Sequence, residues 1–221
     1  LMVALNSDVR VQDRAGNEIG TVSLDAFWSP LGSFSVFAPR LLYDRFNDRW
    51  IFTAVGDGAS PTSALLLAVS LTGDPAGNWY LYSLDADLND QLWMDSPNIG
   101  LNKDWIVVQA NMFTISGGTF DHTRIYAFDK FDFYSGGAGL FTVFADAGIG
   151  GSQIPAVVED NTLAAVYLVQ SYLGNYIGSG FLRLFALTGS VGAESLTPGP
   201  FIGPADPWNE LPPSGGADFA P

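Results

Sequence analysis

Short runs of β-branched, aromatic and aliphatic residues recur along the chain, and glycine, proline, asparagine and aspartate separate them. Runs of this length, bounded by turn-forming residues, are typical of β-strands. A helical period of 3.6 residues is nearly absent. The clearest group of runs lies at 40–44, 49–55, 64–72 and 79–85. We therefore expect an all-β protein.

The pattern repeats with a period of 58 residues. Pro39, Pro97 and Pro155 are spaced by 58 and again by 58. Each proline is followed at fixed offsets by an apolar residue and an Asx residue: Leu41, Ile99 and Val157, then Asp44, Asn102 and Asp160. Several matches in one register predict a structural repeat.

A second set of runs keeps the same register, and it starts at Leu67, Ile125 and Arg183. The tripeptide LTG recurs at 71–73 and at 187–189, which is two periods apart, and Val9 lies one period before Leu67. The later units have their expected strands at 98–102, 105–111, 123–129 and 140–146, and at 156–160, 163–171, 181–188 and 195–202.

Four strands in a unit of this length are typical of a β-propeller blade. We expect a single partial ring of about 3.75 four-stranded antiparallel blades. With strands A to D named from the axis outward, 1–37 supplies strands B to D of a first blade. Complete blades follow at 38–95, 96–153 and 154–219. The incomplete ring favours a piece of a longer chain over a four-bladed ring with a defective seam.

The segment SPNIGLNKDW, residues 96–105, is interpreted as scaffold. Pro97 begins an innermost strand, where a missing N–H is tolerated. Asn102 and Asp104 belong to residue types that favour tight turns. Trp105 opens the next strand and is expected to pack between blades.

Several stretches resemble a family of large secreted bacterial β-propeller proteins, most of them without a known activity. The stretches are RLLYDRFNDRWIFTAV, LLLAVSLTGDPAGNWYLYSLD, MDSPNIGLNKDWIVVQANMF and RIYAFDK. The resemblance covers essentially the whole chain. It implies a ring of six or seven blades, of which this chain is the N-terminal part, and an extracellular or cell-surface location. It implies no catalytic residue.

Composition excludes several classes of function. Twenty-three acidic residues against nine basic ones give a formal net charge of −14, which disfavours nucleic-acid binding. The chain has no cysteine and one histidine, His122, so cysteine chemistry and a multi-histidine metal site are excluded. His122 is interpreted as a loop histidine without a function. No apolar run is long enough for a membrane helix.

The expected B–C loops (56–63, 113–123 and 172–180) and D–A connections (25–38, 85–96 and 201–220) are long and share one face of the propeller. Long loops on a rigid scaffold often carry function. Trp28, Trp93 and Trp208 fall in the D–A connections, where exposed aromatic rings would stack on sugars or anchor a protein. The alternative is that they fill gaps between blades.

Asp85, Asp87 and Asn89 occupy alternate positions, as oxygen ligands do at the start of a calcium loop. The glycine and glutamate of an EF-hand are missing, so a solvated acidic turn is the alternative. No other cofactor is indicated.

Asp44, Asp95 and Glu159 lie beside the innermost strands. Glycosidases need two carboxyl groups about 5–10 Å apart, but Asp44 and Glu159 are expected near A–B turns, on the opposite face from Asp95.

We therefore expect a non-catalytic protein that presents its loop face to a protein or glycan partner, or that has a structural role at the surface. A carbohydrate-active hydrolase or lyase is the alternative. The open ends of the partial ring are expected to pair with the remaining blades of a longer chain or with another copy.

Overall fold

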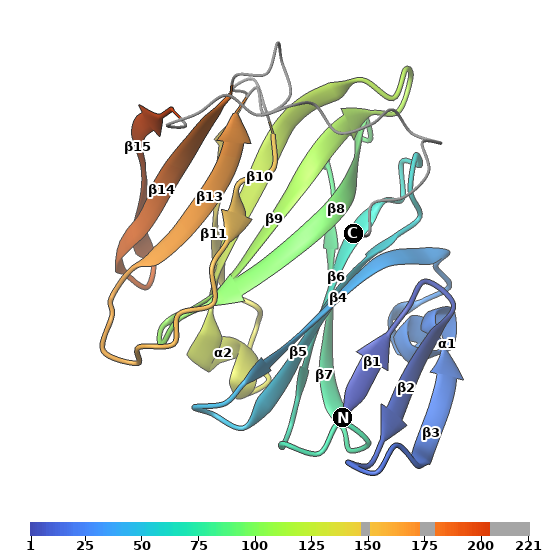
Figure 1. Ribbon diagram of the computed structural model, residues 1–221. Coiled ribbons are helices and arrows are strands. Elements are labelled where there is room, and N and C mark those ends of the chain that lie inside the picture. Colours follow the sequence, from blue (N-terminus) through green and yellow to red (C-terminus); the bar gives the residue numbers. More distant parts are fainter. Residues whose placement is uncertain (147–150, 173–179, 204–221) are drawn as a thin grey trace, which may run out of the picture.

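The computed structural model describes residues 1–146, 151–172 and 180–203. Four antiparallel β-sheets follow one another along the chain and stack face to face (Figure 1). The expectation of an all-β protein is confirmed, and in the described part of the chain no sheet closes on itself.

The first sheet has three strands in the order β1-β2-β3. These are β1 (Met2–Ala4), β2 (Asp8–Gln12) and β3 (Glu18–Ser23). They correspond to the three strands expected in 1–37. Two short helices follow them, α1 (Leu24–Trp28) and the 3-10 helix η1 (Ser29–Leu31).

The second and third sheets each have four strands in a simple meander. The second sheet consists of β4 (Val36–Asp44), β5 (Arg49–Gly56), β6 (Ala64–Ser70) and β7 (Trp79–Asp85). The third sheet consists of β8 (Leu92–Leu101), β9 (Trp105–Thr114), β10 (Phe120–Asp129) and β11 (Phe141–Asp146), with α2 (Lys130–Tyr134) between the last two strands. All eight expected strands are present, and several are longer than predicted.

The fourth sheet has the order β12-β13-β14-β15. Its strands are β12 (Ile154–Pro155), β13 (Val166–Tyr172), β14 (Phe181–Ser190) and β15 (Ala193–Ile202). The prediction of a strand at 156–160 is wrong, because β12 consists of Ile154 and Pro155 only. Residues 204–219 of the predicted last unit lie outside the described residues.

The 58-residue spacing of Pro39 and Pro97 corresponds to a backbone feature that is the same in β4 and β8. The pairing register shifts between Phe37 and Arg40 in β4 and at the equivalent place in β8. Ala38 and Ser96, which precede Pro39 and Pro97, both have a φ of 52°. A bulge with a left-handed residue followed by proline therefore recurs after 58 residues. The predicted unit boundaries at 38 and 96 lie inside these strands rather than between them.

The recurrence of LTG does not mark equivalent positions. Residues 71–73 follow the end of β6 at Ser70, whereas 187–189 lie inside β14. Differences in hairpin length between the sheets shift the register of the later strands, so the sequence period is lost there.

The turn of the SPNIGLNKDW segment forms as expected. The Asn102 Oδ1 atom accepts hydrogen bonds from the backbone N–H groups of Asp104 and Trp105 at 2.9 Å each. Trp105 opens β9 and is fully buried between the third and fourth sheets. The predicted turn and the buried position of Trp105 are confirmed, whereas Pro97 does not begin its strand: β8 starts at Leu92, and Pro97 lies within it at the register shift.

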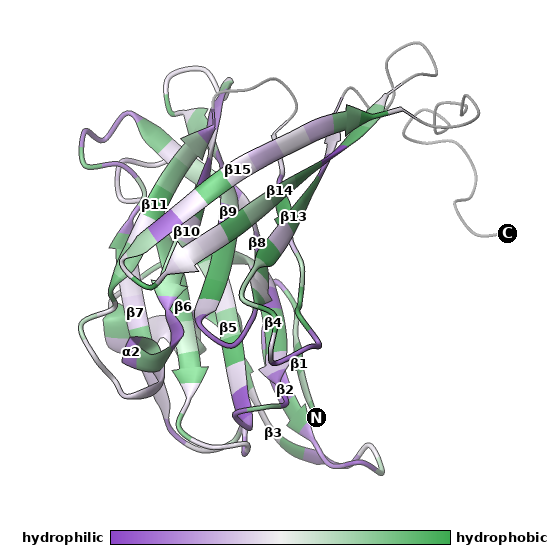
Figure 2. Cartoon of the chain, turned by 90° about the vertical axis from the view of Figure 1, so that its left-hand side faces the viewer, coloured by the Kyte–Doolittle hydropathy of each residue, from purple (hydrophilic) through white to green (hydrophobic). Residues whose placement is uncertain are grey.

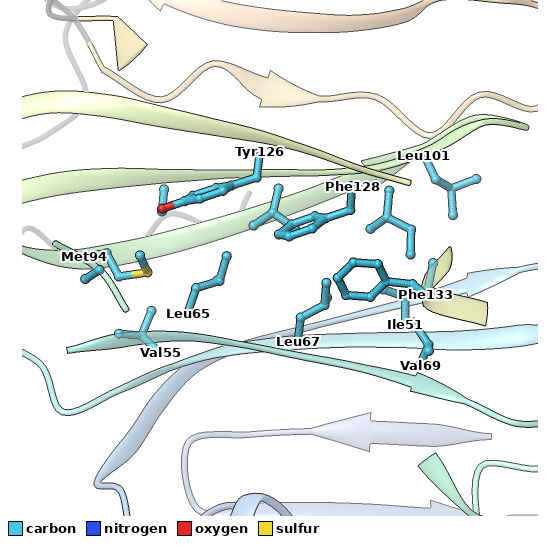
Figure 3. Packing of buried hydrophobic residues seen from close by; sticks show 14 of the residues in the cluster. Ile51, Val55, Leu65, Leu67, Val69, Met94, Leu101, Tyr126, Phe128 and Phe133 are labelled. Atoms are coloured by element: carbon cyan, nitrogen blue, oxygen red, sulfur yellow. The ribbon is translucent and has the colours of Figure 1, made fainter. Parts of the chain in front are cut away.

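Three apolar clusters hold the stack together, one between each pair of neighbouring sheets. In β6 every residue is buried, because alternate side chains contact the first sheet and the third. Figure 2 shows the hydrophobic residues of the central strands. Figure 3 shows Leu65, Leu67 and Val69 of the second sheet facing Tyr126 and Phe128 of the third.

The first strand of the third sheet, β8, and the segment that follows β12 approach one another so closely that their backbones form hydrogen bonds. The Leu101 N–H donates to the Ala156 carbonyl at 3.2 Å, and the Val158 N–H donates to the Leu101 carbonyl at 2.8 Å. A Cβ atom at Gly100 would lie 2.4 Å from the Ala156 oxygen. Glycine at this position therefore permits contact between the third and fourth sheets.

We expect Gly100→Ala to lower the free energy of unfolding by about 1–3 kcal/mol, because the added methyl group overlaps backbone atoms. Urea unfolding followed by circular dichroism measures this. Gly20→Ala is the matched control, since a Cβ at Gly20 meets nothing within 4 Å. Equal stability of the two variants would contradict the steric role of Gly100.

Candidate functional site

A pocket of about 640 Å³ opens between the outer strands of the second and third sheets. Its volume is in the range of small-molecule binding sites. The end of β7 and the β7–β8 connection form one wall, and β10 and β11 form the other. The lining residues are Leu84, Asp85, Asp87, Leu88, Asn89, His122, Arg124, Tyr126, Phe141, Val143 and Ala145.

The wall formed by β10 and β11 follows from strand geometry. Alternate residues of a strand face the same side, so His122, Arg124 and Tyr126 all line the pocket. On β11, Val143 lies directly across from Tyr126. Phe141 contacts Tyr126 edge to face at a centroid distance of 5.6 Å and is 45% exposed, so part of its ring is available to a ligand.

The opposite wall is held by its own hydrogen bonds. The Asp85 Oδ1 atom accepts the Asp87 N–H at 2.8 Å. The Asp87 Oδ2 atom accepts the N–H groups of Gln91 and Leu92 at 3.1 and 3.2 Å. Asp87 is buried, and its carboxylate therefore fixes the shape of the β7–β8 connection.

Arg124 crosses the pocket and joins the two walls. Its guanidinium donates to the Ala86 carbonyl and lies 3.8 Å from the Asp87 Oδ1 atom. Its Nε–H also donates to the His122 Nε2 atom at 3.2 Å. Because His122 Nε2 accepts, the Nδ1 atom carries the proton, and it lies 2.6 Å from Asp121 Oδ1. The chain Asp121–His122–Arg124–Asp87 thus sets the position of the guanidinium.

The hydroxyl of Tyr126 is buried, and its oxygen has no hydrogen bond of ordinary geometry to any described residue. The ring stacks on Phe128, with 9° between the planes, and its oxygen points away from Phe128 (Figure 3). Burial raises the pKa of Tyr126, and the neighbouring Arg124 guanidinium partly offsets this effect. The hydroxyl therefore keeps its proton and remains a donor. Its oxygen is covered, so a ligand reaches it only when the neighbouring side chains move.

The three residues of the calcium prediction all line this pocket. In the described part of the chain, no three acidic or histidine side chains are grouped so that they could hold a metal ion. Asp87 already binds backbone N–H groups. Calcium at Asp85, Asp87 and Asn89 stays a prediction.

The sequence did not identify His122 as part of a site. His122 lies in β10 and not in the loop predicted at 113–123. The loop between β9 and β10 covers only 115–119. Arg124 and Tyr126 were likewise missed, since they meet the β7–β8 connection only through the stacking of two sheets.

Asp44 forms a buried ion pair with Lys130. The Lys130 Nζ atom lies 2.5 Å from Asp44 Oδ2 and donates to the Asn102 carbonyl at 2.6 Å. The hydroxyl of Tyr134 donates to the same Asp44 oxygen at 2.8 Å. Burial alone would raise the pKa of Asp44, but hydrogen bonds from Lys130, Asn47 and Tyr134 and the Lys130 charge lower it. Asp44 therefore joins the second sheet to α2.

The other two candidate carboxylates do not form a catalytic pair with Asp44. Glu159 is exposed and forms an ion pair with Arg45 at 2.7 Å. Asp44 and Glu159 line one pocket, but its volume is only about 10 Å³, far too small for a sugar ring. Asp95 lies near the start of β8, whereas Asp44 ends β4. The Oδ1 atom of Asp95 accepts the Ser96 N–H at 2.6 Å.

For Trp28 the ligand-binding prediction is wrong, and the alternative that the ring fills a gap between sheets is confirmed. Trp28 ends α1 and is fully buried between the first two sheets, where it packs against Phe27 and Phe52. Its ring is therefore closed to a ligand. Trp93 lies in β8 rather than in a connection and packs between Phe37 and Phe113. Trp208 lies outside the described residues.

Two other sizeable pockets also lie between outer strands. One of about 390 Å³ is bordered by the first sheet and Trp79 and has no charged side chain. Another of about 400 Å³ includes Glu194 of the fourth sheet. Glu194 accepts hydrogen bonds from Trp105 and Thr142 of the third sheet, at 3.0 and 2.6 Å, so its carboxylate is already used to join the sheets.

Comparison of the chain with protein-family models, curated proteins and solved structures found no match. The resemblance to secreted bacterial propellers therefore stays a prediction. No helix in the described ranges is long and apolar enough to cross a membrane.

We expect Lys130→Met to lower the free energy of unfolding by about 3–5 kcal/mol at neutral pH, because the Asp44 charge stays buried without its partner. Lys103→Met is the control, since among the described residues the exposed Lys103 forms an ion pair with its partly exposed neighbour Asp104 alone. Chemical denaturation of both variants measures the difference. A loss for Lys130→Met no larger than that of the control would contradict the role of the ion pair.

The stability that Asp44 contributes should depend on pH. A carboxylate whose pKa is lowered in the folded state stabilises the fold above its unfolded pKa of about 3.9, and the contribution is lost as the pH falls below that value. The difference in unfolding free energy between the wild type and Asp44→Asn should therefore shrink between pH 6 and pH 3, values chosen to bracket that pKa. A difference that stays constant over this interval would show that the carboxylate charge is not involved.

Proposed function

We propose that this protein is a non-catalytic binding module and that the pocket between the second and third sheets binds a glycan. The pocket itself, with about 640 Å³, apolar walls and fixed polar groups at its edge, carries the proposal. Sites for small ligands combine mostly apolar walls with a few fixed polar groups. A small movement of the side chains that cover Tyr126 would let its hydroxyl donate to a ligand oxygen.

The charges around the pocket disfavour an anionic ligand. Asp87 and Arg124 offset one another, which leaves Asp85 as the remaining charged group. An anion would be repelled by Asp85 and by a chain of net charge −14. A neutral sugar avoids this penalty, since its hydroxyl groups donate and accept hydrogen bonds.

The lining residues divide into an apolar and a polar group. The exposed part of Phe141 offers a ring on which the C–H face of a sugar can stack. Asp85 and Asn89 offer hydrogen-bond acceptors for sugar hydroxyls. Arg124 is fixed by His122 and Asp87 before the ligand arrives, so little side-chain entropy is lost on binding.

We further propose that the four sheets are blades of a β-propeller. One three-stranded and three four-stranded antiparallel sheets in one stacked series, with bulges repeated at 58-residue spacing in β4 and β8, support this architecture. The β7–β8 connection, which forms one pocket wall, belongs to the loop face predicted to carry function. Recognition of glycans is common outside the cell, and an extracellular location goes with the proposal.

A glycan array tests the proposal, followed by calorimetric titration of the best ligand. We expect Tyr126→Phe to weaken binding about tenfold or more, since a hydrogen bond in a desolvated site is lost. The same substitution should leave the unliganded protein as stable as before or more stable, because it removes a buried hydroxyl that lacks a partner. Tyr43→Phe, at the distant A–B turn, is the matched control.

Phe141→Ala should also weaken binding, whereas Phe131→Ala should not, because Phe131 is 83% exposed on α2 and lines none of these pockets. Failure of every neutral glycan to bind would exclude a glycan as the ligand. Binding that survives both Tyr126→Phe and Phe141→Ala would place the site elsewhere on the protein.

A further inference from the structure

A second groove lies beside the candidate pocket, on the other side of β11. It has a volume of about 400 Å³ and opens between the start of β11 and the turn that joins β14 to β15. Thr142 of β11 and Val191 of the turn are among its lining residues. Phe141 lines both this groove and the candidate pocket. The two hollows are therefore neighbours that share one aromatic residue.

The strand β11 separates the two hollows. It is the last strand of the third sheet, and among the described strands it pairs with β10 alone. Alternate residues of a strand face opposite sides, so Val143 lines the candidate pocket and Thr142 lines the second groove. Leu140, Phe141 and Val143 are 58%, 45% and 48% exposed. A ligand that leaves one hollow therefore meets open apolar surface on its way to the other.

The polar groups of the second groove are fixed by hydrogen bonds within the protein. The Glu194 Oε1 atom accepts hydrogen bonds from Trp105 Nε1 and from the Gly192 N–H, at 3.0 and 2.8 Å. Its Oε2 atom accepts the Thr142 hydroxyl at 2.6 Å. Burial alone would raise the pKa of Glu194, but these hydrogen bonds lower it, so the carboxylate stays ionised at neutral pH. A carboxylate oxygen has about two acceptor positions, which leaves one on Oε2 for a sugar hydroxyl.

The charges of both hollows disfavour an anionic ligand. Asp129 and Glu194 are among the described residues that line the second groove, and no basic residue is. In the candidate pocket, Arg124 is offset by Asp87. A sulfate, phosphate or carboxylate group would therefore be repelled in either place. The apolar surface and the acceptors match instead the C–H faces and hydroxyl groups of a neutral sugar.

We propose that the ligand is a neutral oligosaccharide that crosses the edge of β11, with one sugar in the candidate pocket and a following sugar in the second groove. This inference rests on the proposed function and extends it from a single sugar site to a chain of sugars. Phe141 contacts the ligand where the chain passes from one hollow to the other. Both volumes are in the range of small-ligand sites, and two such contacts joined in one molecule raise the affinity.

Calorimetric titration with oligosaccharides of increasing length tests the proposal. The probes are neutral gluco-, manno- and galacto-oligosaccharides, each from the monosaccharide to the hexasaccharide. We expect the Kd to fall about tenfold or more once the chain is long enough to reach the second groove, because the second contact is then joined to the first.

Two variants divide the site. Val191→Arg places a long side chain in the second groove, where its guanidinium can pair with the Glu194 carboxylate. It should remove the gain with chain length, so that every length binds as the monosaccharide does. Tyr126→Phe lies in the candidate pocket and should instead weaken every length by the same factor.

Val169→Arg is the matched control and should keep the gain with chain length. Val169 is also exposed, at 41%, but it lines none of these pockets. Circular dichroism confirms that each variant is folded.

The outcomes distinguish this inference from the proposed function. Failure of every length to bind overturns both. Binding of the monosaccharide without a gain from added sugars overturns the extended site and leaves the proposed function standing. A gain that survives Val191→Arg, or one that Val169→Arg removes, overturns the assignment of the second sugar to this groove.

Discussion

Burial of both faces of each central sheet is the constraint on which the rest of the structure depends. The strands β5, β6 and β9 carry runs of consecutive apolar residues, as strands do when both sides of a sheet are covered. Such a sheet exposes a large apolar surface to water unless it has a neighbour on each side. The second and third sheets meet this condition inside the chain, because the first and fourth sheets cover their far faces.

Apolar contact is non-directional and does not by itself fix the position of one sheet on the next. The polar contacts between the sheets fix these positions. Lys130 joins the third sheet to Asp44 of the second, and Glu194 of the fourth sheet binds Trp105 of the third. Breaking a buried charge pair is costly even where its net contribution to stability is small. These groups therefore act mainly by disfavouring other arrangements, and the close approach at Gly100 restricts the innermost strands in the same way.

The sequence predicted what depends on local pattern and missed what depends on how the sheets meet. The strands of the second and third sheets followed from turn residues and strand-length apolar runs, and the turn at Asn102 followed from its chemistry. The short helix that ends at Trp28 did not, because a single turn of helix leaves no periodic signal. In the candidate site, Asp85 and Asp87 were noticed, but Tyr126 was not. It lies on another sheet, in a strand where its aromatic character looks like ordinary core.

The location of the pockets follows from the same stacking. The first strand of the third sheet and the segment that follows β12 contact one another through backbone hydrogen bonds, whereas pockets open toward the last strands of each successive pair of sheets. Twist makes neighbouring sheets diverge away from their closest contact, so each junction leaves a groove at its outer edge. One groove is apolar, and in another Glu194 is used to join the sheets. Only between the second and third sheets, in the part of the chain described, does a groove combine fixed charges with a buried tyrosine hydroxyl. Specific binding needs such directional groups, and this groove, lined by residues of three strands and one connection, is therefore the candidate site.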